Sequence, residues 1–190
     1  MFRNKTYDLV NCATFCKTKD RFGGLSNMAG GFPLIVNEIP IRTSEALYQA
    51  CRFPDHPEVQ AEIIKQASPM AAKLVIKPFV HLTRDDWIDV RVDVMRWALS
   101  VKLLQSFVSF GDLLVSTNNL PIVELSMKDD FWGAKPQRDG TLVGQNVLGC
   151  LLTELREMFS EDPFPLLFVD PLVDGMRLMG EEIERISLVM

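Results

Sequence analysis

The spacing of apolar residues along the chain predicts helices connected by short strands and loops. From Trp87 to Leu104, apolar residues recur at alternating steps of three and four, which is typical of a long helix packed along one side. Thr83 and Asp86 have the spacing of a capping box, so we expect this helix to begin at Thr83 and to end near residue 107. A second apolar stripe predicts a helix over 146–159.

Shorter helices are predicted before the long one. Thr43 or Ser44 can cap a helix that continues to about residue 53. Three residues share its polar face: Glu45, Gln49 and Arg52. Pro57 and the pair Ser68-Pro69 are typical of helix starts and predict two further short helices.

The remaining segments predict strands and loops. Alternation over 32–42 around Asn37-Glu38 predicts a β-hairpin. Residues 113–126 indicate two strands, LLVST and IVELS, although the first could instead be a short helix. The glycine-rich stretch 21–31 and the segment KDDFWGAKPQRDG at 128–140 lack periodicity and are predicted to be loops.

These elements predict an α+β fold, a predominantly helical single domain with short β-hairpins over residues 1–160. The length of 190 residues and a hydrophobic content of 47% suit one ordinary domain with its own core. Residues 161–190 are predicted to be a C-terminal extension, rich in proline at first and then an amphipathic helix. Its aligned apolar residues are Met176, Met179, Ile183 and Ile186. This helix could pack on the domain or form a dimer contact.

Charge and composition exclude several classes of function. The formal net charge is −5, so the molecule as a whole should not coat nucleic acid or an anionic membrane. A local basic pocket for one phosphorylated molecule remains compatible with that charge. The N-terminal segment MFRNKTYDLV lacks the apolar core of a signal peptide, and no apolar run is long enough to span a membrane. We therefore expect a soluble cytoplasmic protein without a membrane partner.

The distribution of cysteine and histidine argues against a metal site. The four cysteines include no CxxC pair, and His56 and His81 each lack a second ligand at helical spacing. We expect reduced thiols, no metal and no cofactor. GxGxxG and GxxxxGK[ST] are both absent, which argues against a dinucleotide or P-loop fold.

Three features are candidates for chemistry. Glu45 lies in the first turn of its helix, where an acid either only favours the helix dipole or serves a reaction. In KDDFWG, two acids precede two aromatic residues, which could fill the core or offer a ring face to a ligand. Lys102 lies one step from the apolar side of the long helix, where a lysine either extends to solvent or is paired with a carboxylate.

Seven segments occur in order along residues 20–160. They are LSNM at 25–28, TSEALYQACRF at 43–53, SPMAAK at 68–73, Trp87 with Arg91 and Met95, Lys102, IVELSMKDDFWG at 122–133, and GQNVLGCLLTELR at 144–156. Each is weakly specific alone, but in this order they resemble the YbiA-like or NADAR (NAD and ADP-ribose) family. Residues after Ser160 lie outside the resemblance.

The resemblance implies an N-glycoside hydrolase that acts on a ribosyl substrate with a 5′ phosphate. Substrate types of that family include phosphoribosylamino-pyrimidine intermediates of riboflavin synthesis and ADP-ribose attached to guanine. Cleavage of a C1′–N bond passes through an oxocarbenium-like state. It requires a carboxylate near C1′, a route for protonating the leaving nitrogen and an anion pocket.

The resemblance also implies roles for individual residues. Glu45 falls on the glutamate of the family's SEH motif and would stabilise the cation or activate water. The family form with two residues between Asp and Trp selects Asp129 over Asp130 as the second acid. Trp132 would stack on or wall the base. Asn27 and Asn146 would bond ribose or phosphate oxygens, and Gly133 is also implied to contact the substrate.

The sequence departs from the family pattern at two positions near Glu45. The histidine that usually follows the glutamate is Ala46, and the lysine usual in QAxKF is Arg52. An imine mechanism needs an amine that loses its proton, which a guanidinium does not do. Arg52 could therefore bind phosphate, and Lys73 or Lys102 would have to supply the amine. The family's WGxG run is WGAK here, which leaves the substrate open.

Together these features predict a hydrolase that cleaves the C1′–N bond of a phosphoribosylated or ADP-ribosylated base. We expect Glu45, Asp129 and Lys102 to be catalytic, and Arg52 and Lys73 to bind the substrate phosphate. The expected partner is a small ribosyl-phosphate or ADP-ribosyl molecule, with ADP-ribosylated nucleic acid and a homodimer through the extension as further candidates. Two alternatives stay open: a non-catalytic ADP-ribose or NAD-binding module, and a partner-binding protein that uses its C-terminal extension.

Overall fold

The computed structural model describes residues 2–161 and 167–187, and it has the predicted α+β class. The described chain forms two compact units. One contains residues 2–26 and 108–161, and the other contains 27–107 and 167–187. No single helix among the described residues is long and apolar enough to cross a membrane.

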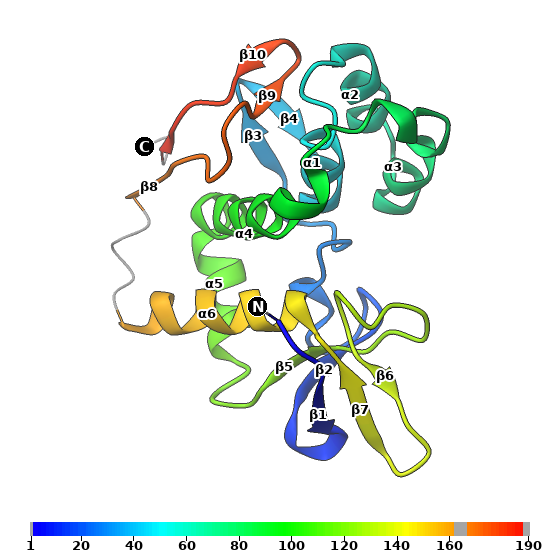
Figure 1. Cartoon of the computed structure of the whole chain (residues 1–190). Coiled ribbons are helices and arrows are strands. Elements are labelled where there is room, and N and C mark those ends of the chain that lie inside the picture. Colours follow the sequence, from blue (N-terminus) through cyan, green and yellow to red (C-terminus); the bar gives the residue numbers. More distant parts are fainter. Residues whose placement is uncertain (1, 162–166, 188–190) are drawn as a thin grey trace. The chain divides into compact units, whose positions relative to one another are not determined.

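The first unit combines short strands with two helices (Figure 1). Its antiparallel sheet has the strand order β1 (Lys5–Asp8), β7 (Thr141–Gly144) and β6 (Lys135–Pro136). In a separate two-stranded sheet, β2 (Ala13–Phe15) pairs in parallel with β5 (Ile122–Glu124). Helix α6 (Val147–Glu161) packs on β5. Helix α5 (Phe107–Val115) approaches α6 so closely that a Cβ on Gly111 would lie 2.4 Å from the ring of Phe159.

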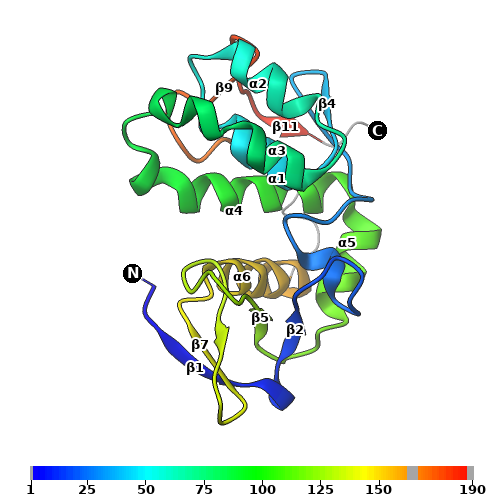
Figure 2. The same cartoon turned by 90° about the vertical axis from the view of Figure 1, so that its right-hand side faces the viewer.

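The second unit is mainly helical (Figure 2). Helices α1 (Ser44–Ala50), α2 (Pro57–Ile64) and α3 (Pro69–Val75) pack on one another, and α1 also packs on α4 (Trp87–Gln105). The fully buried residues Leu47, Phe53 and Trp97 belong to this core. The hairpin of β3 (Leu34–Val36) and β4 (Ile39–Ile41) is confirmed.

Local chemistry explains why these elements begin and turn where they do. The Oγ1 atom of Thr43 accepts a hydrogen bond from the amide of Ala46, and Ser68 caps α3 in the same way. Asn37 and Glu38 have φ values of 49° and 63°, as a two-residue hairpin turn requires. The side-chain amide of Gln105 then joins the end of α4 to β3 by exchanging two hydrogen bonds with the backbone of Ile35, each 2.7 Å long.

Three predicted elements differ in the structure. The long helix begins at Trp87 and not at Thr83, because the carboxylate of Asp86 accepts hydrogen bonds from Arg84 and makes no capping bond. The first three residues of the predicted strand LLVST belong to helix α5, the alternative that the sequence left open, and the last two form the turn after it. The loop 128–140 contains the short strand β6, which pairs with β7.

The C-terminal extension contains strands where an amphipathic helix was predicted. The strands are β8 (Phe168–Val169), β9 (Arg177–Leu178), β10 (Glu181–Glu182) and β11 (Ile186–Ser187), while 162–166 in the proline-rich stretch lie outside the described residues. Met179 and Gly180 have φ values of 55° and 92°, which no right-handed helix accommodates. Met176 and Ile183 are buried, whereas Met179 is 39% exposed. Helical periodicity was therefore misleading here.

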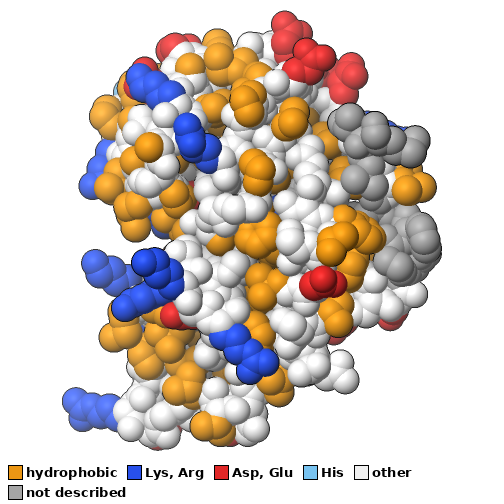
Figure 3. Space-filling view, turned by 180° about the vertical axis from the view of Figure 1, so that it is seen from behind, with side chains coloured by type: hydrophobic (Ala, Val, Ile, Leu, Met, Phe, Trp, Pro, Cys, Tyr) orange, Lys and Arg blue, Asp and Glu red, His pale blue; other side chains and the backbone are white. Residues whose placement is uncertain are grey.

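The extension is anchored to α2 by the buried side chain of Gln60. Its Nε2 atom donates to the backbone oxygens of Ala50 and Arg177, and its Oε1 atom accepts from the amide of Met179 at 2.6 Å. The turn between β9 and β10 brings exposed acids, Glu181 and Glu182, to the surface. Acidic side chains gather at the top of the face in Figure 3, the end where Figure 1 labels β9 and β10.

We predict that Gln60→Ala lowers the free energy of unfolding by about 2 kcal/mol, because it leaves one buried and two partly buried backbone groups without their partner. Urea unfolding of the two proteins measures this loss. Gln137→Ala, at an exposed glutamine whose amide bonds only locally, is the control and should change little. Equal midpoints for wild type and Gln60→Ala would contradict the anchoring role.

Candidate active site

Glu45 is a buried carboxylate held between two side-chain amides. It lies in the first turn of α1 and is only 5% exposed. Asn27 donates from Nδ2 to Glu45 Oε2 over 2.7 Å, and Gln49 donates from Nε2 to Glu45 Oε1 over 2.9 Å. Each carboxylate oxygen therefore accepts a hydrogen bond from a different amide, which fixes the orientation of the carboxylate plane.

The backbone around Asn27 is tied to the start of the same helix. Its carbonyl oxygen accepts from the amide of Glu45 at 3.1 Å and from the hydroxyl of Ser44 at 3.2 Å. These bonds satisfy donors that the first turn of a helix leaves without partners. The segment LSNM and helix α1 thus form one local structure, in which Asn27 and Glu45 come together.

The clamp around Glu45 leaves two amide oxygens unpaired. Because both amide nitrogens face the carboxylate, Oδ1 of Asn27 and Oε1 of Gln49 point elsewhere, and neither has a hydrogen-bond partner in the described structure. Asn27 is 3% exposed and Gln49 is 5% exposed. Burying an acceptor without a donor costs about 1–3 kcal/mol. Such atoms are suited to accept hydrogen bonds from a bound ligand.

Gln49 is a site residue that our residue-by-residue assignment missed. The sequence did contain a signal for it, because Glu45 and Gln49 are four positions apart on one helix and share a face. A buried glutamine beside a buried glutamate indicates a hydrogen-bonded pair. Helical spacing alone, however, does not reveal that the shared face is buried.

Lys102 is completely buried on α4. Its ammonium group lies 4.4 Å from the centre of the Phe32 ring. Burial lowers the pKa of Lys102 from 10.5 to about 7. A substantial fraction of this amine is therefore uncharged at neutral pH, unlike an exposed lysine.

Arg52 and Lys73 occupy different environments. Nε of Arg52 donates to Thr83 Oγ1 over 2.7 Å, and its guanidinium lies 5.7 Å from the centre of the Trp87 ring. Burial lowers the pKa of Arg52. Lys73 is exposed on α3. The predicted phosphate-binding role therefore falls on one anchored guanidinium and one solvent-exposed ammonium.

In the first unit, Asp129 shapes the loop that contains Trp132. Oδ1 of Asp129 accepts from the backbone amides of Phe131 and Trp132, each over 2.9 Å. The rings of Phe131 and Trp132 meet edge to face with centroids 5.0 Å apart. Asp130, the acid that the family spacing rejected, is exposed and accepts from Lys135, which lowers its pKa.

Gly133 and Asn146 make backbone contacts that explain their identity. A Cβ on Gly133 would lie 2.5 Å from the carbonyl oxygen of Glu124, so only glycine fits beside β5. Asn146 is 1% exposed, accepts from the amide of Glu124 at 3.1 Å and donates to the carbonyl of Ile122 at 2.8 Å. Its φ of 50° suits asparagine at this bend before α6.

The predicted site residues therefore fall into separate groups. Glu45 and Asn27 contact each other in the second unit, which also contains Arg52, Lys73 and Lys102. The other four predicted residues belong to the first unit and surround one loop: Asp129, Trp132, Gly133 and Asn146. Within residues 2–161 and 167–187, no cluster of three or more His, Cys, Asp or Glu side chains could hold a metal ion.

Comparison with known proteins gives matches over most of the chain. A family model, the NADAR domain, matches residues 14–160. N-glycosidase YbiA of Escherichia coli strain K12 is 35% identical over 146 residues, which are 77% of this chain and 87% of that protein. A riboflavin biosynthesis protein of Vibrio vulnificus is 33% identical over 130 residues, which are 67% of this chain but only 34% of the relative.

A solved structure agrees with these sequence matches. The NMR structure of YbiA from Escherichia coli has a TM-score of 0.67 and 32% sequence identity to this chain. The alignment covers 83% of this chain and 88% of the YbiA chain. The resemblance carried by the seven sequence segments is thus confirmed, and the chain belongs to the NADAR domain family.

Proposed function

We propose that this protein is an N-glycosidase that hydrolyses the C1′–N bond of a ribosyl phosphate or ADP-ribosyl compound. The observation that carries this proposal is the buried carboxylate of Glu45 in its clamp of two amides. Family membership and the names of the relatives support the same chemistry. In the reaction the C1′–N bond breaks, water supplies a hydroxyl to C1′, and the released base takes a proton.

The geometry around Glu45 suits the charge that develops during such a cleavage. As the C1′–N bond breaks, positive charge builds on the ribose ring, and a nearby carboxylate stabilises that charge. A carboxylate already oriented by Asn27 and Gln49 needs no reorganisation as the reaction proceeds. Positioned in this way, Glu45 either stabilises the cation directly or accepts a proton from the attacking water.

The unpaired oxygens of Asn27 and Gln49 suit the hydroxyl groups of a sugar. A hydroxyl hydrogen donates to an amide oxygen, whereas a phosphate oxygen only accepts. Of the two roles that the resemblance offered Asn27, we therefore favour binding a ribose hydroxyl over binding a phosphate. Hydrogen bonds from the sugar would satisfy the two buried acceptors and locate C1′ relative to the carboxylate.

A basic segment in the same unit supports a phosphorylated substrate. Residues 63–84 contain four Lys or Arg residues and no acid, although the whole chain has a net charge of −5. Lys65 and Arg84 pair with Glu62 and Asp86, respectively. Lys73 and Lys77 are exposed and form no ion pair among the described residues. We propose that Arg52 and Lys73 contribute to binding the phosphate.

The substrate itself is proposed at the level of chemical class. The riboflavin-related relative favours a phosphoribosylated pyrimidine, and the NADAR motifs favour an ADP-ribosyl base. Incubating the protein with phosphoribosylated pyrimidines, ADP-ribosylated nucleic acid, ADP-ribose and NAD, with mass spectrometry of the released base, distinguishes these classes. Release of a base from none of them would argue against the proposal.

We predict that Glu45→Gln lowers kcat about 100-fold or more on the substrate found in this panel, because the neutral amide cannot stabilise the oxocarbenium charge. The amide has the same shape, so the circular dichroism spectrum should be unchanged. Glu58→Gln, at an exposed first-turn acid of α2, is the matched control and should keep full activity.

The same pair of variants separates catalysis from simple binding. A non-catalytic ADP-ribose or NAD-binding module would bind its ligand in calorimetric titrations and release no base, with or without Glu45. Full turnover by Glu45→Gln would remove Glu45 from the mechanism.

We predict that Gln49→Glu has a kcat that increases as the pH falls, unlike the wild type. The new carboxyl keeps an acceptor oxygen but donates a hydrogen bond to Glu45 only when it is protonated. Steady-state kinetics across pH measure this effect, and KM should change less than kcat. Gln66→Glu, at a half-buried glutamine of the second unit, serves as the control. Parallel pH profiles for Gln49→Glu and wild type would show that Gln49 does not position the carboxylate.

A lysine-based route is the second mechanistic candidate, and the environment of Lys102 favours it over one based on Arg52. An uncharged amine can attack C1′ and expel the base, forming an imine with the opened sugar while its two protons pass to the base and to O4′; water then hydrolyses the imine to release the sugar and restore the amine. Borohydride reduction during turnover would trap that imine on Lys102. Trapping with the wild type but not with Lys102→Met would favour this route over direct hydrolysis at Glu45.

The pH dependence of stability tests the burial of Lys102. Its pKa of about 7 lies below the 10.5 of an exposed lysine, so the unfolded chain binds more protons between these values. We predict that the free energy of unfolding of wild type, relative to Lys102→Met, increases from about pH 7 toward pH 10 and is flat below pH 6. Urea denaturation at each pH measures this difference. A difference that stays constant with pH would mean that burial does not lower the pKa of the Lys102 amine.

A further inference from the structure

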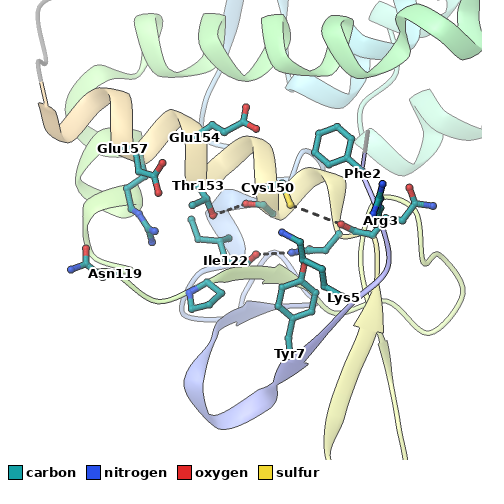
Figure 4. A pocket seen from close by; sticks show the side chains of 15 residues that line it. Phe2, Arg3, Lys5, Tyr7, Asn119, Ile122, Cys150, Thr153, Glu154 and Glu157 are labelled. Atoms are coloured by element: carbon teal, nitrogen blue, oxygen red, sulfur yellow. Dashed lines mark hydrogen bonds between the residues drawn. The ribbon is translucent and has the colours of Figure 1, made fainter.

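The first unit contains a second candidate binding site, a cavity of about 580 Å³ between its N-terminal strand and helix α6 (Figure 4). The strand side contributes Phe2, Arg3, Lys5 and Tyr7, and the helix side contributes a stripe from Gly149 to Glu157. Residues 119–122 close one edge. The volume lies within the range of about 300–1,000 Å³ usual for small-molecule sites.

The strand side of the cavity is positively charged. Lys5 and Tyr7 are two positions apart on β1 and point to the same side, and Arg3, which lies just before β1, also lines the cavity. Figure 4 shows all three beside α6. Arg3 and Lys5 form no ion pair or side-chain hydrogen bond among the described residues. Two unpaired cations beside one cavity favour an anionic group.

The helix side carries the opposite charge. Arg156 lines the cavity from α6, but its guanidinium already donates to Thr117 and to the backbone of Leu120. Glu154 and Glu157 line the cavity beside it and are exposed to solvent, so the carboxylates give this wall its net negative charge. They would repel a ligand that is only anionic and attract an ammonium group. The two walls therefore have opposite signs across one small cavity, which is the arrangement that a molecule with both charges requires.

The groups between these walls are neutral and polar. The hydroxyl of Tyr7 is buried beside the side chains of Asn146 and Cys150, without a hydrogen bond of standard geometry. Burial raises the pKa of Tyr7 and of Cys150, so both groups keep their protons at neutral pH. Asn146 also lines the cavity, but its side-chain amide is already bonded to β5. Tyr7, Cys150 and Asn146 thus form a neutral polar lining between the two charged walls.

We propose that this cavity binds a small zwitterion of the amino-acid type, with its carboxylate toward Arg3 and Lys5 and its ammonium group toward Glu154 and Glu157. The family match begins at residue 14, so the strand wall lies outside the matched region. None of the second-unit residues proposed to bind the phosphorylated sugar lines this cavity, so its ligand is proposed as a separate molecule. The site does not depend on the proposed activity and can be tested in its absence.

The test is a titration of the full-length protein, labelled with ¹⁵N, with each of the twenty standard L-amino acids and with inorganic phosphate. We expect at least one amino acid to shift the amide signals of Tyr7, Cys150 and Thr153, and phosphate to shift them much less. The N-acetyl derivative and the methyl ester of the amino acid that binds each lack one of its two charges, and each should bind at least about ten times more weakly. No shift with any amino acid at 10 mM, or equal binding by phosphate, would overturn the proposal.

Two sets of variants locate the binding. Arg3→Gln with Lys5→Gln, and separately Glu154→Gln with Glu157→Gln, should each weaken binding of the selected amino acid at least about tenfold. Lys17→Gln with Lys19→Gln removes two exposed cations of the same unit that do not line the cavity, and it should leave binding unchanged. Each pair probes one surface. Arg3 and Lys5 lie on the strand side of the cavity, Glu154 and Glu157 lie on its helix side, and the two control lysines lie outside it. Unchanged affinity in both cavity variants would place the ligand elsewhere and overturn the proposal.

Discussion

The chemistry proposed here depends on one hydrogen-bonded group, the carboxylate of Glu45 between the amides of Asn27 and Gln49. A buried carboxylate is stable only where donors replace the water it has lost. The two amides supply those donors and give the group one orientation. They also leave two amide oxygens without partners, so the structure that stabilises the carboxylate also creates acceptors for a sugar. Stability and recognition are coupled at this point of the fold.

The loop that contains Trp132 illustrates a different use of polar residues. Oδ1 of Asp129 caps two backbone amides, and the amide of Asn146 bonds to the backbone on both sides of Val123. Gly133 is required because a Cβ would collide with β5. These residues build the loop that presents the aromatic pair. The presence of Asp129, Gly133 and Asn146 in the family motifs is thus explained in part by their contacts with the backbone, in addition to any contact with the substrate.

The sequence predicted elements whose determinants are local. The hairpin at Asn37-Glu38 and the helices capped by Thr43 and Ser68 depend on neighbouring residues, and all three are present. The capping box at Thr83 failed because Arg84 competes for Asp86, a choice that spacing does not reveal. The predicted C-terminal helix failed because its apolar residues pack in a turn whose positive φ angles no periodicity indicates. Motif order predicted the family, whereas the Asn27–Glu45 contact depends on tertiary packing and Gln49 required knowledge of which helix face is buried.

The most direct test of the central claim is a crystal structure of the inactive Glu45→Gln variant with its intact substrate. The account predicts that C1′ of the sugar lies within about 3.5 Å of the side chain at position 45. It also predicts that sugar hydroxyls donate to Asn27 Oδ1 and Gln49 Oε1. A substrate bound with its C1′ remote from this side chain, and with the two amide oxygens still unpaired, would contradict the account.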